Sequence, residues 1–586
     1  MKEGLNSLKR LYSYISPYKI AFFGALFMAV TSIAMNGLLP FVTGLPTTRI
    51  IKNLAKGEGV DFTYISKVLI GVLIIGSIYS LASYASQYLM TNVVQHAMRD
   101  LRKDITEKIN RLPVSYFDTN QFGDVLSRVT NDVDAVGNAM QQSFIAIVNA
   151  VLGIIIAVVA MLLINVKLAL IVMTIIPLSL LVSKLVVKLS QKYFKEQQKS
   201  LGNLNGFVQE NLTGFQILKL FGREEQTIED FKTVNNQLAE NGFKAAAISG
   251  MLMPLVNLTA YSAYIGVAVT GSFMVIGGTL LVGNLQAFIQ YVWQVNQPMG
   301  QISQLSSVLQ SASAATKRVF EILDEAEDTV NVTDVPLPAD IRGDVTFDNV
   351  SFSYDPNKPL IQNLNVTVKS GQTVAIVGPT GAGKTTLINL LMRFYDVTEG
   401  AIKIDGIDTK AMNRSDVRSL FGMVLQDAWL YNGTIADNIR FGKLDAEEYE
   451  VVDAAKTANV DHFIRTMPGG YEMVINEEGD NISLGQKQLL TIARAVISDP
   501  KILILDEATS SVDTRLEKLI QTAMEKVMEG RTSFVIAHRL STIKNADLIL
   551  VMDQGQIIEQ GTHDELIEAK GFYETLYNSQ FSEEAE

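Results

Sequence analysis

Long apolar segments alternate with polar stretches through the first half of the chain. Six of them approach the roughly 20 residues that a helix needs to cross a bilayer, and they cover residues 18–46, 64–90, 138–163, 166–190, 246–276 and 281–308. The long polar stretches near 91–137 and 191–245 keep a helical pattern with few breakers, so we expect the membrane helices to extend well beyond the bilayer. These stretches are rich in Lys and Arg, which favours the cytoplasm; the short loop near 47–63 weakly favours the opposite orientation.

In the second half, short β-rich runs alternate with helical stretches. This pattern predicts an α/β domain with a largely parallel sheet and an antiparallel portion. The acidic segment 324–341 contains two prolines and marks the change. We therefore predict an all-α, six-helix transmembrane domain at 1–323, a linker at 324–341 and an α/β domain at 342–582.

Composition excludes several classes of function. The chain has 586 residues, a formal net charge of −12, four histidines and no cysteine. The negative charge argues against a nucleic-acid partner, and the lack of cysteine excludes disulfides, cysteine-ligated metals and thiol catalysis. The N-terminus is too polar, and its apolar run too short, for a cleaved signal peptide.

The sixth apolar segment carries a stripe of amides. Six glutamines recur at spacings of three or four residues and share one helical face: Gln286, Gln290, Gln294, Gln297, Gln301 and Gln304. Lipid would leave these amides without hydrogen bonds, so the face must meet protein or water. Packing between helices is one interpretation. A substrate cavity lined by Gln290, Gln294, Gln297 and Gln301 is the one we favour, because the stripe is long and the sequence offers no obvious partner stripe.

A glycine-rich loop in the second half predicts phosphate binding. It follows an apolar strand and opens a helix, the context that a P-loop requires, and comprises Gly378, Pro379, Thr380, Gly381, Ala382, Gly383, Lys384, Thr385 and Thr386. The glycines allow successive backbone N–H groups to converge on phosphate at a helix N-terminus. We expect Lys384 to reach the β and γ phosphates of ATP and Thr385 to bind Mg²⁺.

Two further strand ends carry candidate catalytic groups. Asp506 ends an apolar strand and is placed to hold the Mg²⁺ shell. Glu507, beside it, is the expected group that polarises the attacking water. His538 ends another strand, which we expect to neighbour the phosphate loop, and we interpret it as a γ-phosphate sensor.

Together these motifs resemble the ATP-binding cassette exporters, and the resemblance to a half-transporter of that family covers essentially the whole chain. It implies that Tyr354 stacks on adenine, that Gln426 touches Mg²⁺ and that Asp513 couples two cassettes across their interface. Residues 111–133 and 211–226 resemble the segments that hold coupling helices. The amphipathic segment Leu8–Tyr18 resembles the elbow helix that lies on the membrane surface.

The signature motif departs from the family pattern. In the family it is usually Leu-Ser-Gly-Gly-Gln and contacts the ATP held by the partner cassette; here it is Ile482 followed by Ser483, Leu484, Gly485 and Gln486. Leu484 replaces a glycine and adds bulk beside a close phosphate contact. Asn476 and Glu478 stand where the family usually has Gly and often has Arg. All three departures lie on the surface offered to the partner's ATP.

This distribution predicts one subunit of a heterodimeric multidrug exporter in the cell membrane, with cytoplasmic cassettes and termini. Its expected partners are a second half-transporter, the lipid bilayer and lipophilic or amphipathic small molecules. A homodimer that tolerates Leu484 remains an alternative, as do lipid or peptide export, an ATP-gated regulator or receptor, and a membrane-anchored nucleotidase.

Overall fold

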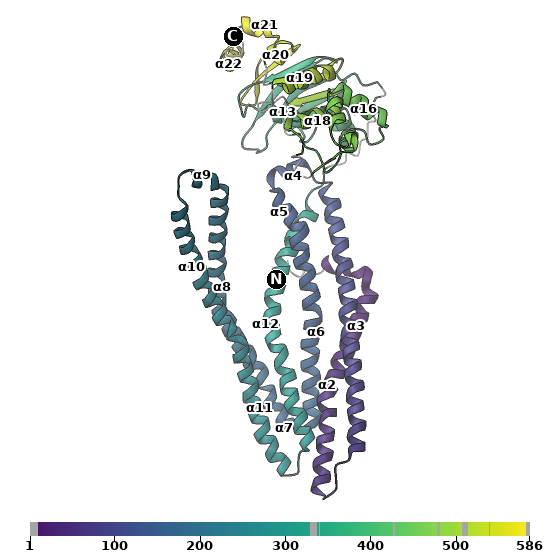
Figure 1. Cartoon of the computed structure of the whole chain (residues 1–586), viewed down its shortest axis with the longest axis vertical. Coiled ribbons are helices and arrows are strands. Elements are labelled where there is room, and N and C mark those ends of the chain that lie inside the picture. Colours follow the sequence, from purple (N-terminus) through teal and green to yellow (C-terminus); the bar gives the residue numbers. More distant parts are fainter. Residues whose placement is uncertain are drawn as a thin grey trace. The chain divides into compact units, whose positions relative to one another are not determined.

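The computed structural model describes residues 10–328, 337–338, 340–425, 428–476, 481–506, 514–537 and 540–581. The chain forms two compact units (Figure 1). Unit 1 contains Met1–Leu112 and Asn120–Ala326, and unit 2 contains Pro113–Thr119 and Glu327–Glu586. The short helix α4 (Val114–Thr119) therefore belongs to the same unit as the α/β domain, although it lies in the first half of the sequence.

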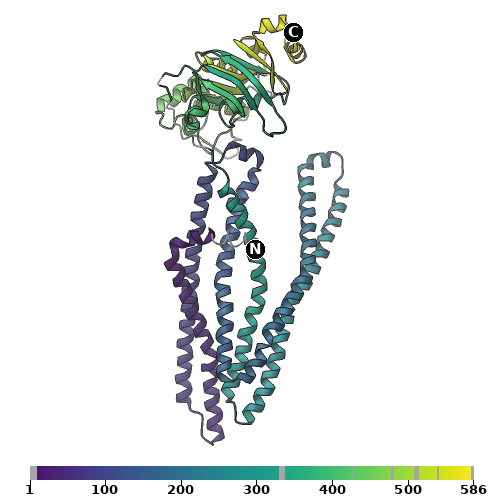
Figure 2. The same cartoon turned by 180° about the vertical axis from the view of Figure 1, so that it is seen from behind.

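Unit 1 consists of long helices, in agreement with the apolar pattern. Its main helices are α2 (Lys19–Ala55), α3 (Phe62–Ile109), α6 (Val133–Ile164), α8 (Ile175–Thr213), α10 (Glu224–Gly250), α11 (Leu252–Ile276) and α12 (Val282–Asp324). Shorter elements are η1 (Ser16–Tyr18), α5 (Phe122–Ser127), the π-helical η2 (Arg128–Asp132), α7 (Val166–Met173) and α9 (Phe215–Leu220). α8 and α10 run side by side to α9, as both views show (Figures 1 and 2).

Five stretches of helix among the described residues are long and apolar enough to span a membrane: Arg10–Ala55, Phe62–Ile109, Phe122–Ile164, Val166–Thr213 and Glu224–Ile276. The sixth predicted segment is also helical, as part of α12. Its amides lower its hydropathy, and it is not among these five stretches. The predicted extension of the helices is confirmed by their lengths. α3 has 48 residues, about 72 Å at 1.5 Å per residue, against a hydrocarbon core of about 30 Å.

α2 and α12 approach each other at two glycines. A Cβ added at Gly283 would lie 1.9 Å from the carbonyl oxygen of Gly44, and one added at Gly44 would lie 2.3 Å from that of Gly283. The backbone N–H of Gly283 donates to the hydroxyl of Thr48 at 3.0 Å. Small residues permit this close helix–helix contact, which is characteristic of membrane bundles.

The start of the described chain is tied to other helices of unit 1. Residues 10–15 are helical, in the segment where we expected an elbow helix, and Leu8 lies outside the described residues. Arg10 forms a two-pronged ion pair with Asp324, with distances of 2.5 and 2.7 Å. Its guanidinium also lies 4.0 Å from the ring centre of Phe320. The last turns of α12 are thus held by the beginning of the chain.

Unit 2 has the predicted α/β fold. Among the described residues it contains a six-stranded sheet in the order β12-β11-β3-β10-β9-β6 and a four-stranded antiparallel sheet in the order β2-β1-β4-β5. The first sheet is parallel except for β12. Strands β3, β9, β10 and β11 are almost continuously buried, as expected for a sheet covered on both faces. The strands are β1 (Val345–Phe352), β2 (Ile361–Val368), β3 (Thr373–Val377), β4 (Glu399–Ile404), β5 (Ile407–Asp408), β6 (Phe421–Val424), β7 (Gly433–Thr434), β8 (Val474–Ile475), β9 (Ile502–Asp506), β10 (Thr532–Ile536), β11 (Leu548–Asp553) and β12 (Gln556–Gly561).

Helices pack around these sheets to form two apolar clusters. One lies between the parallel sheet, α18 and α19, and the other lies between the two sheets and α13. The helices of unit 2, after α4, are α13 (Lys384–Leu391), η3 (Thr409–Ala411), α14 (Arg414–Ser419), α15 (Ile435–Arg440), α16 (Glu448–Thr457), α17 (Asp461–Thr466), η4 (Gly470–Glu472), α18 (Leu484–Ile497), α19 (Thr514–Met528), α20 (Leu540–Lys544), α21 (His563–Glu568) and α22 (Phe572–Phe581).

Candidate nucleotide site

Four neighbouring parallel strands bring the predicted site residues to one edge of the sheet. β3 leads into the glycine-rich loop, and β10 lies between β3 and β9, as we expected for the strand before His538. β9 ends at Asp506, and β6, its other neighbour, ends two residues before Gln426. Because the carboxyl ends of parallel strands share an edge, the ends of these four strands lie together there, the usual place for a ligand in an α/β sheet.

The glycine-rich loop has a backbone that requires glycine. Gly378 has φ of 154°, and a Cβ there would lie 2.2 Å from the carbonyl oxygen of Met552. Gly383, at the N-cap of α13, has φ of 100°. Left-handed backbone of this kind is readily adopted by glycine alone. This backbone leads the chain from the loop into the first turn of α13. There, the unpaired N–H groups of the helix N-terminus and the helix dipole favour an anion.

Lys384 is held inside this loop. Its Nζ donates to the carbonyl oxygens of Gly378 and Pro379 at 2.6 and 3.1 Å. Burial lowers the pKa of Lys384 below its ordinary value, and the negative charge of Asp506 opposes that shift. The carboxylate of Asp506 is thus near enough to the ammonium of Lys384 to influence its charge. Thr385, next in sequence, is exposed.

This donor set fits a nucleotide with its metal. The loop supplies N–H groups and one ammonium for phosphate oxygens, while Asp506 and Thr385 supply the hard oxygen ligands that Mg²⁺ prefers. The described part of the site therefore suits Mg²⁺–ATP in both charge and ligand type.

Tyr354 follows β1 and lies beside the loop helix. Its hydroxyl donates to that of Thr386 at 3.3 Å. Its ring packs edge-on against Phe352 and Tyr395, with ring centres 4.9 and 5.0 Å apart. Half of the side chain, 51%, stays exposed, which leaves surface for a base to stack on.

The signature segment begins α18, and its serine caps that helix. Ser483 is the N-cap residue and forms a capping box with Gln486: the serine hydroxyl accepts from the Gln486 N–H at 3.4 Å, and the Gln486 side chain accepts from the Ser483 N–H at 2.9 Å. Ile482 is buried, whereas Leu484 is 45% exposed. Leu484 therefore adds apolar surface at the helix N-terminus without disturbing the cap.

Several predicted site residues lie outside the described residues, namely Gln426, Glu478, Glu507, Asp513 and His538. The side chains of Gln301 and Gln304 are likewise not described. Asn476 is exposed at the end of β8. The roles of all these residues stay predictions.

Part of the glutamine stripe packs against another helix, the interpretation that we favoured less. Three of its members contact α2: Gln286 accepts from Thr47 at 2.5 Å, Gln290 accepts from Thr43 at 3.4 Å, and Gln294 donates to the carbonyl oxygen of Asn36 at 3.2 Å. The sequence did not reveal this because the partners are scattered hydroxyls and a backbone carbonyl, not a second row of amides. Gln297 is exposed. Gln286, Gln290 and Gln294 thus take part in packing against α2. The prediction of a substrate cavity now depends on Gln297 and Gln301.

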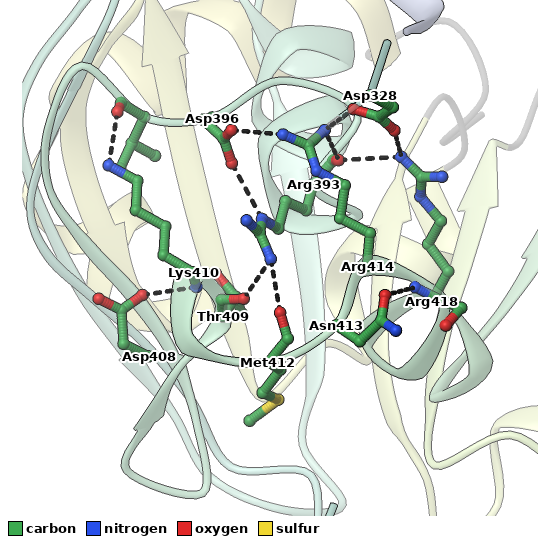
Figure 3. Close-up of polar contacts among 12 residues, drawn as sticks. Asp328, Arg393, Asp396, Asp408, Thr409, Lys410, Met412, Asn413, Arg414 and Arg418 are labelled. Carbon is green, nitrogen blue, oxygen red and sulfur yellow. Dashed lines mark hydrogen bonds and ion pairs between the residues drawn. The ribbon is translucent and has the colours of Figure 1, made fainter. Parts of the chain in front are cut away.

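A cluster of charged residues in unit 2 escaped the sequence analysis (Figure 3). Arg414 pairs with Asp328 at 2.6 Å and also with Asp396. Arg418 pairs with Asp328 at 3.3 Å, and Arg393 pairs with Asp396 at 2.9 Å. Arg393 and Asp396 lie three residues apart, but the pairs of Asp328 with Arg414 and Arg418 join segments far apart in the sequence, so spacing along the chain gives no sign of them.

Two family descriptions match the chain. Residues 22–299 match the ABC transporter transmembrane region, and residues 361–510 match the ABC transporter family.

Individual relatives cover nearly the whole chain. It is 44% identical over 521 residues to a protein of Mycobacterium bovis named fatty acid ABC transporter ATP-binding/permease protein, covering 89% of this chain and 82% of that one. It is 36% identical over 578 residues to an ATP-dependent lipid A-core flippase of Desulfotalea psychrophila, covering 98% and 99%. A solved bacterial Atm1-family ABC exporter with ATP bound superimposes with a TM-score of 0.77 at 28% identity, covering 96% of this chain and 98% of that one.

Proposed function

The chain belongs to the ABC transporter family, with the membrane and nucleotide-binding domains of an exporter half-transporter, and on that premise we propose that it is one subunit of a heterodimer that exports lipophilic or amphipathic compounds. The family's cassette couples ATP hydrolysis to transport, so the chain is a transport ATPase of the membrane. ABC exporters work as dimers. The identity of the second subunit and the class of substrate are the parts that we propose.

Within the nucleotide site we assign a role to each group. Bound Mg²⁺–ATP supplies the phosphoanhydride bond whose hydrolysis drives transport. Lys384 and the loop N–H groups hold the phosphates, Tyr354 stacks on the base, and Thr385, Gln426 and Asp506 hold the metal. Glu507 orients and deprotonates the attacking water, a role worth about 10²–10⁴ in rate. His538 contacts the γ-phosphate, and Asp513 lies at the interface between cassettes.

The exposed Leu484 supports a heterodimer more than any other observation. In a head-to-tail pair of cassettes, the N-terminus of α18 meets the ATP of the partner. Leu484 occupies that surface, whereas the described residues of this chain's own phosphate loop keep the geometry that phosphate binding needs. We therefore infer that this chain's ATP is hydrolysed with the partner's signature, and that the partner's ATP turns over slowly.

A second subunit would also cover apolar surface on α9. Leu220 and Phe221 at the end of this helix are 78% and 70% exposed, and Phe215 and Ile217 are also exposed. No residue of α9 is buried within the chain. Apolar side chains gathered on one short exposed helix are typical of an interaction site, and we assign this one to the second subunit.

Amphipathic substrates suit the membrane unit. We propose that Gln297, which is exposed, and Gln301 line the cavity, while Gln290 and Gln294 join its wall to α2. We further propose that the nucleotide-binding domain (342–582), the linker (324–341) and both termini are cytoplasmic, and that the transmembrane domain comprises residues 1–323.

The names of two relatives favour a narrower class of substrate, acyl lipids, and the export of acyl lipids by a homodimer is our second candidate. One relative is named for fatty acids and the other for lipid A-core. Both kinds of molecule are amphipathic, so the same membrane unit would accept them.

Affinity purification of this chain from its native membrane separates the two candidates. The heterodimer predicts a second half-transporter in equal amount, identified by mass spectrometry; recovery of this chain alone, as a dimer, would favour the homodimer. Transport into inverted vesicles should then be compared for fatty acids, lipids and cationic drugs. Gln297→Leu should change the order of preference among them, with Gln286→Leu, whose amide bonds to α2, as the matched packing control.

A further inference from the structure

One face of α8 is lined with lysines. At 3.6 residues per turn, or about 100° per residue, they fall within an arc of about 80°. The buried residues of this helix between 179 and 190 lie on the opposite side, so the lysines face away from the bundle. All of them are exposed, and they are Lys184, Lys188, Lys192, Lys195 and Lys199.

The first three of these residues, which we call the lysine row (Lys184, Lys188 and Lys192), lie where the helix leaves the bilayer. The span that contains α8 begins at Val166, and Lys184 follows 18 residues later, after about 27 Å of helix at 1.5 Å per residue. The hydrocarbon core is about 30 Å thick, so the row begins at the level of the lipid headgroups. Exposed leucines at 181, 185 and 189 lie between these lysines in the sequence and offer apolar surface beside them.

The helices packed against α8 bring no carboxylate to the lysine row. Hydrogen bonds of 2.7 Å between Ser179 and Thr259, and of 2.9 Å between Ser200 and Asn241, fix how α8 lies along α10 and α11. α8 therefore meets the stretch 241–259, whose one charged residue is another cation, Lys244. α7 and α11 contain no acid at all. The charge of the row is thus not neutralised from these helices.

Within the described part of the chain, no residue of the lysine row forms an ion pair. The nearest acid along α8, Glu196, comes four positions after the end of the row. Cations on other helices of unit 1 behave differently: Arg318, for example, holds Asp132 with distances of 2.5 and 2.8 Å. Like charges four residues apart destabilise a helix. Helix stability therefore does not explain the row, whereas a bound anion would relieve its repulsion.

We propose that the lysine row binds the anionic headgroup of a phospholipid, in the leaflet nearer α9 (Figure 1). The ammonium groups meet the phosphate, and the exposed leucines beside them contact the acyl chains. Lysine suits this position because its stem lies along apolar surface while its charge stays at the interface. Basic residues directly beyond a spanning segment attract anionic lipids. The leucines on the same face favour a lipid over an acidic protein surface. The inference goes beyond the proposed function and depends on neither its partner nor its substrate.

Photolabelling in nanodiscs tests the proposal. The transporter, as isolated with its second subunit, is placed in phosphatidylcholine nanodiscs that contain a small fraction of photoactivatable lipid. That lipid is either phosphatidylglycerol or phosphatidylcholine, with a diazirine on the same acyl carbon. Labelled peptides of this chain are quantified by mass spectrometry. The stretch of α3 that holds Tyr84 and Tyr88 is the internal control, because both rings are exposed and no Lys, Arg, Asp or Glu occurs between Lys67 and Arg99.

In the native chain, phosphatidylglycerol should label α8 at least about fivefold more than phosphatidylcholine does, the effect of a single lysine near an anionic lipid surface. The α3 control should show no preference. The triple variant Lys184→Gln/Lys188→Gln/Lys192→Gln should abolish the preference at α8, and the corresponding triple change to Arg should keep it. Lys232→Gln, which alters an exposed lysine of α10, should have no effect. At about 1 M salt, where the Debye length is about 3 Å, the preference should shrink.

Equal labelling of α8 by the two lipids in the native chain would overturn the proposal, and so would a preference that survives the triple glutamine variant. If that variant has a lowered Tm, Lys188→Gln alone replaces it, and an unchanged preference there would contradict the role of the row. A carbodiimide, which joins an amine to an adjacent carboxylate, tests the other occupant of this face. Crosslinks from the row to acids of the second subunit, without lipid labelling of α8, would assign the face to a subunit contact and overturn lipid binding.

Discussion

In the head-to-tail pair of cassettes that we propose, this chain offers two surfaces to ATP, and the motifs expected at these surfaces differ in how closely they follow the family pattern. At the end of β3 the loop glycines have the backbone that a phosphate loop needs, and Lys384 and Asp506 are the expected phosphate and metal ligands. At the start of α18, Leu484 is exposed where the resemblance leads us to expect glycine. Since a pair of cassettes forms two composite sites, the integrity of a site must be judged from the residues of both chains that build it. One chain can therefore be intact at one site and altered at the other.

The altered surface is not a damaged fold. Ser483 and Gln486 still form a capping box, and leucine is among the better helix formers. Ile482 and Gly485, on either side, remain buried in the cassette. The change at Leu484 is thus confined to the face that a partner's nucleotide would meet, which is what a functional difference between two sites requires.

The largest expected effect comes from the surface that we consider intact. Glu507→Gln should lower steady-state ATPase of the assembled transporter by about 10²–10⁴-fold while ATP still binds, because the base that activates water is lost. Asp453→Asn, which alters an exposed carboxylate on α16, is the matched control for an acid-to-amide change. Retention of more than about a third of the activity would contradict the role of Glu507.

A smaller effect is expected from restoring the signature. Leu484→Gly should raise ATPase by no more than a few-fold, because the partner's site is expected to lack other groups as well. Helix stability should fall by roughly 1 kcal/mol or less, the cost of glycine in a helix. The double variant Leu484→Gly/Glu507→Gln should remain nearly inactive. Full recovery of the double variant would mean that the partner's site, not this one, carries turnover.

The smallest effect on activity should follow from Ser483→Ala. If the α18 surface already supports little hydrolysis, losing the serine hydroxyl should change ATPase by less than about twofold. The loss of the N-cap should still destabilise the domain by about 1 kcal/mol, measurable as a lower Tm. A large loss of ATPase without a matching loss of stability would show that the two surfaces contribute equally to catalysis.

Patterns local in the sequence predicted most of the fold and part of the site. Apolar runs predicted the helices of unit 1 and the strands of unit 2, and Gly378 and Gly383 predicted the phosphate loop. Helices, strands and tight loops depend mainly on residues that are neighbours in the sequence. Contacts between segments that are distant in the sequence could not be predicted from these local patterns. The pairing of Gln286 with Thr47, of Asp328 with Arg414 and of Tyr395 with Asp118 depends on how elements pack in space. No spacing rule encodes these contacts.

The ATPase of this chain alone, purified and reconstituted in lipid, tests the inequality of the two surfaces most directly. A homodimer would place Leu484 against both of its ATP molecules, so the account predicts a rate at least about tenfold below that of the complex isolated with its second subunit, since losing one transition-state contact costs on the order of 10²–10³. Dimer formation is verified by mass photometry in the same sample. Robust hydrolysis by the homodimer, with both sites turning over at comparable rates, would contradict the account and reduce Leu484 to a tolerated variant.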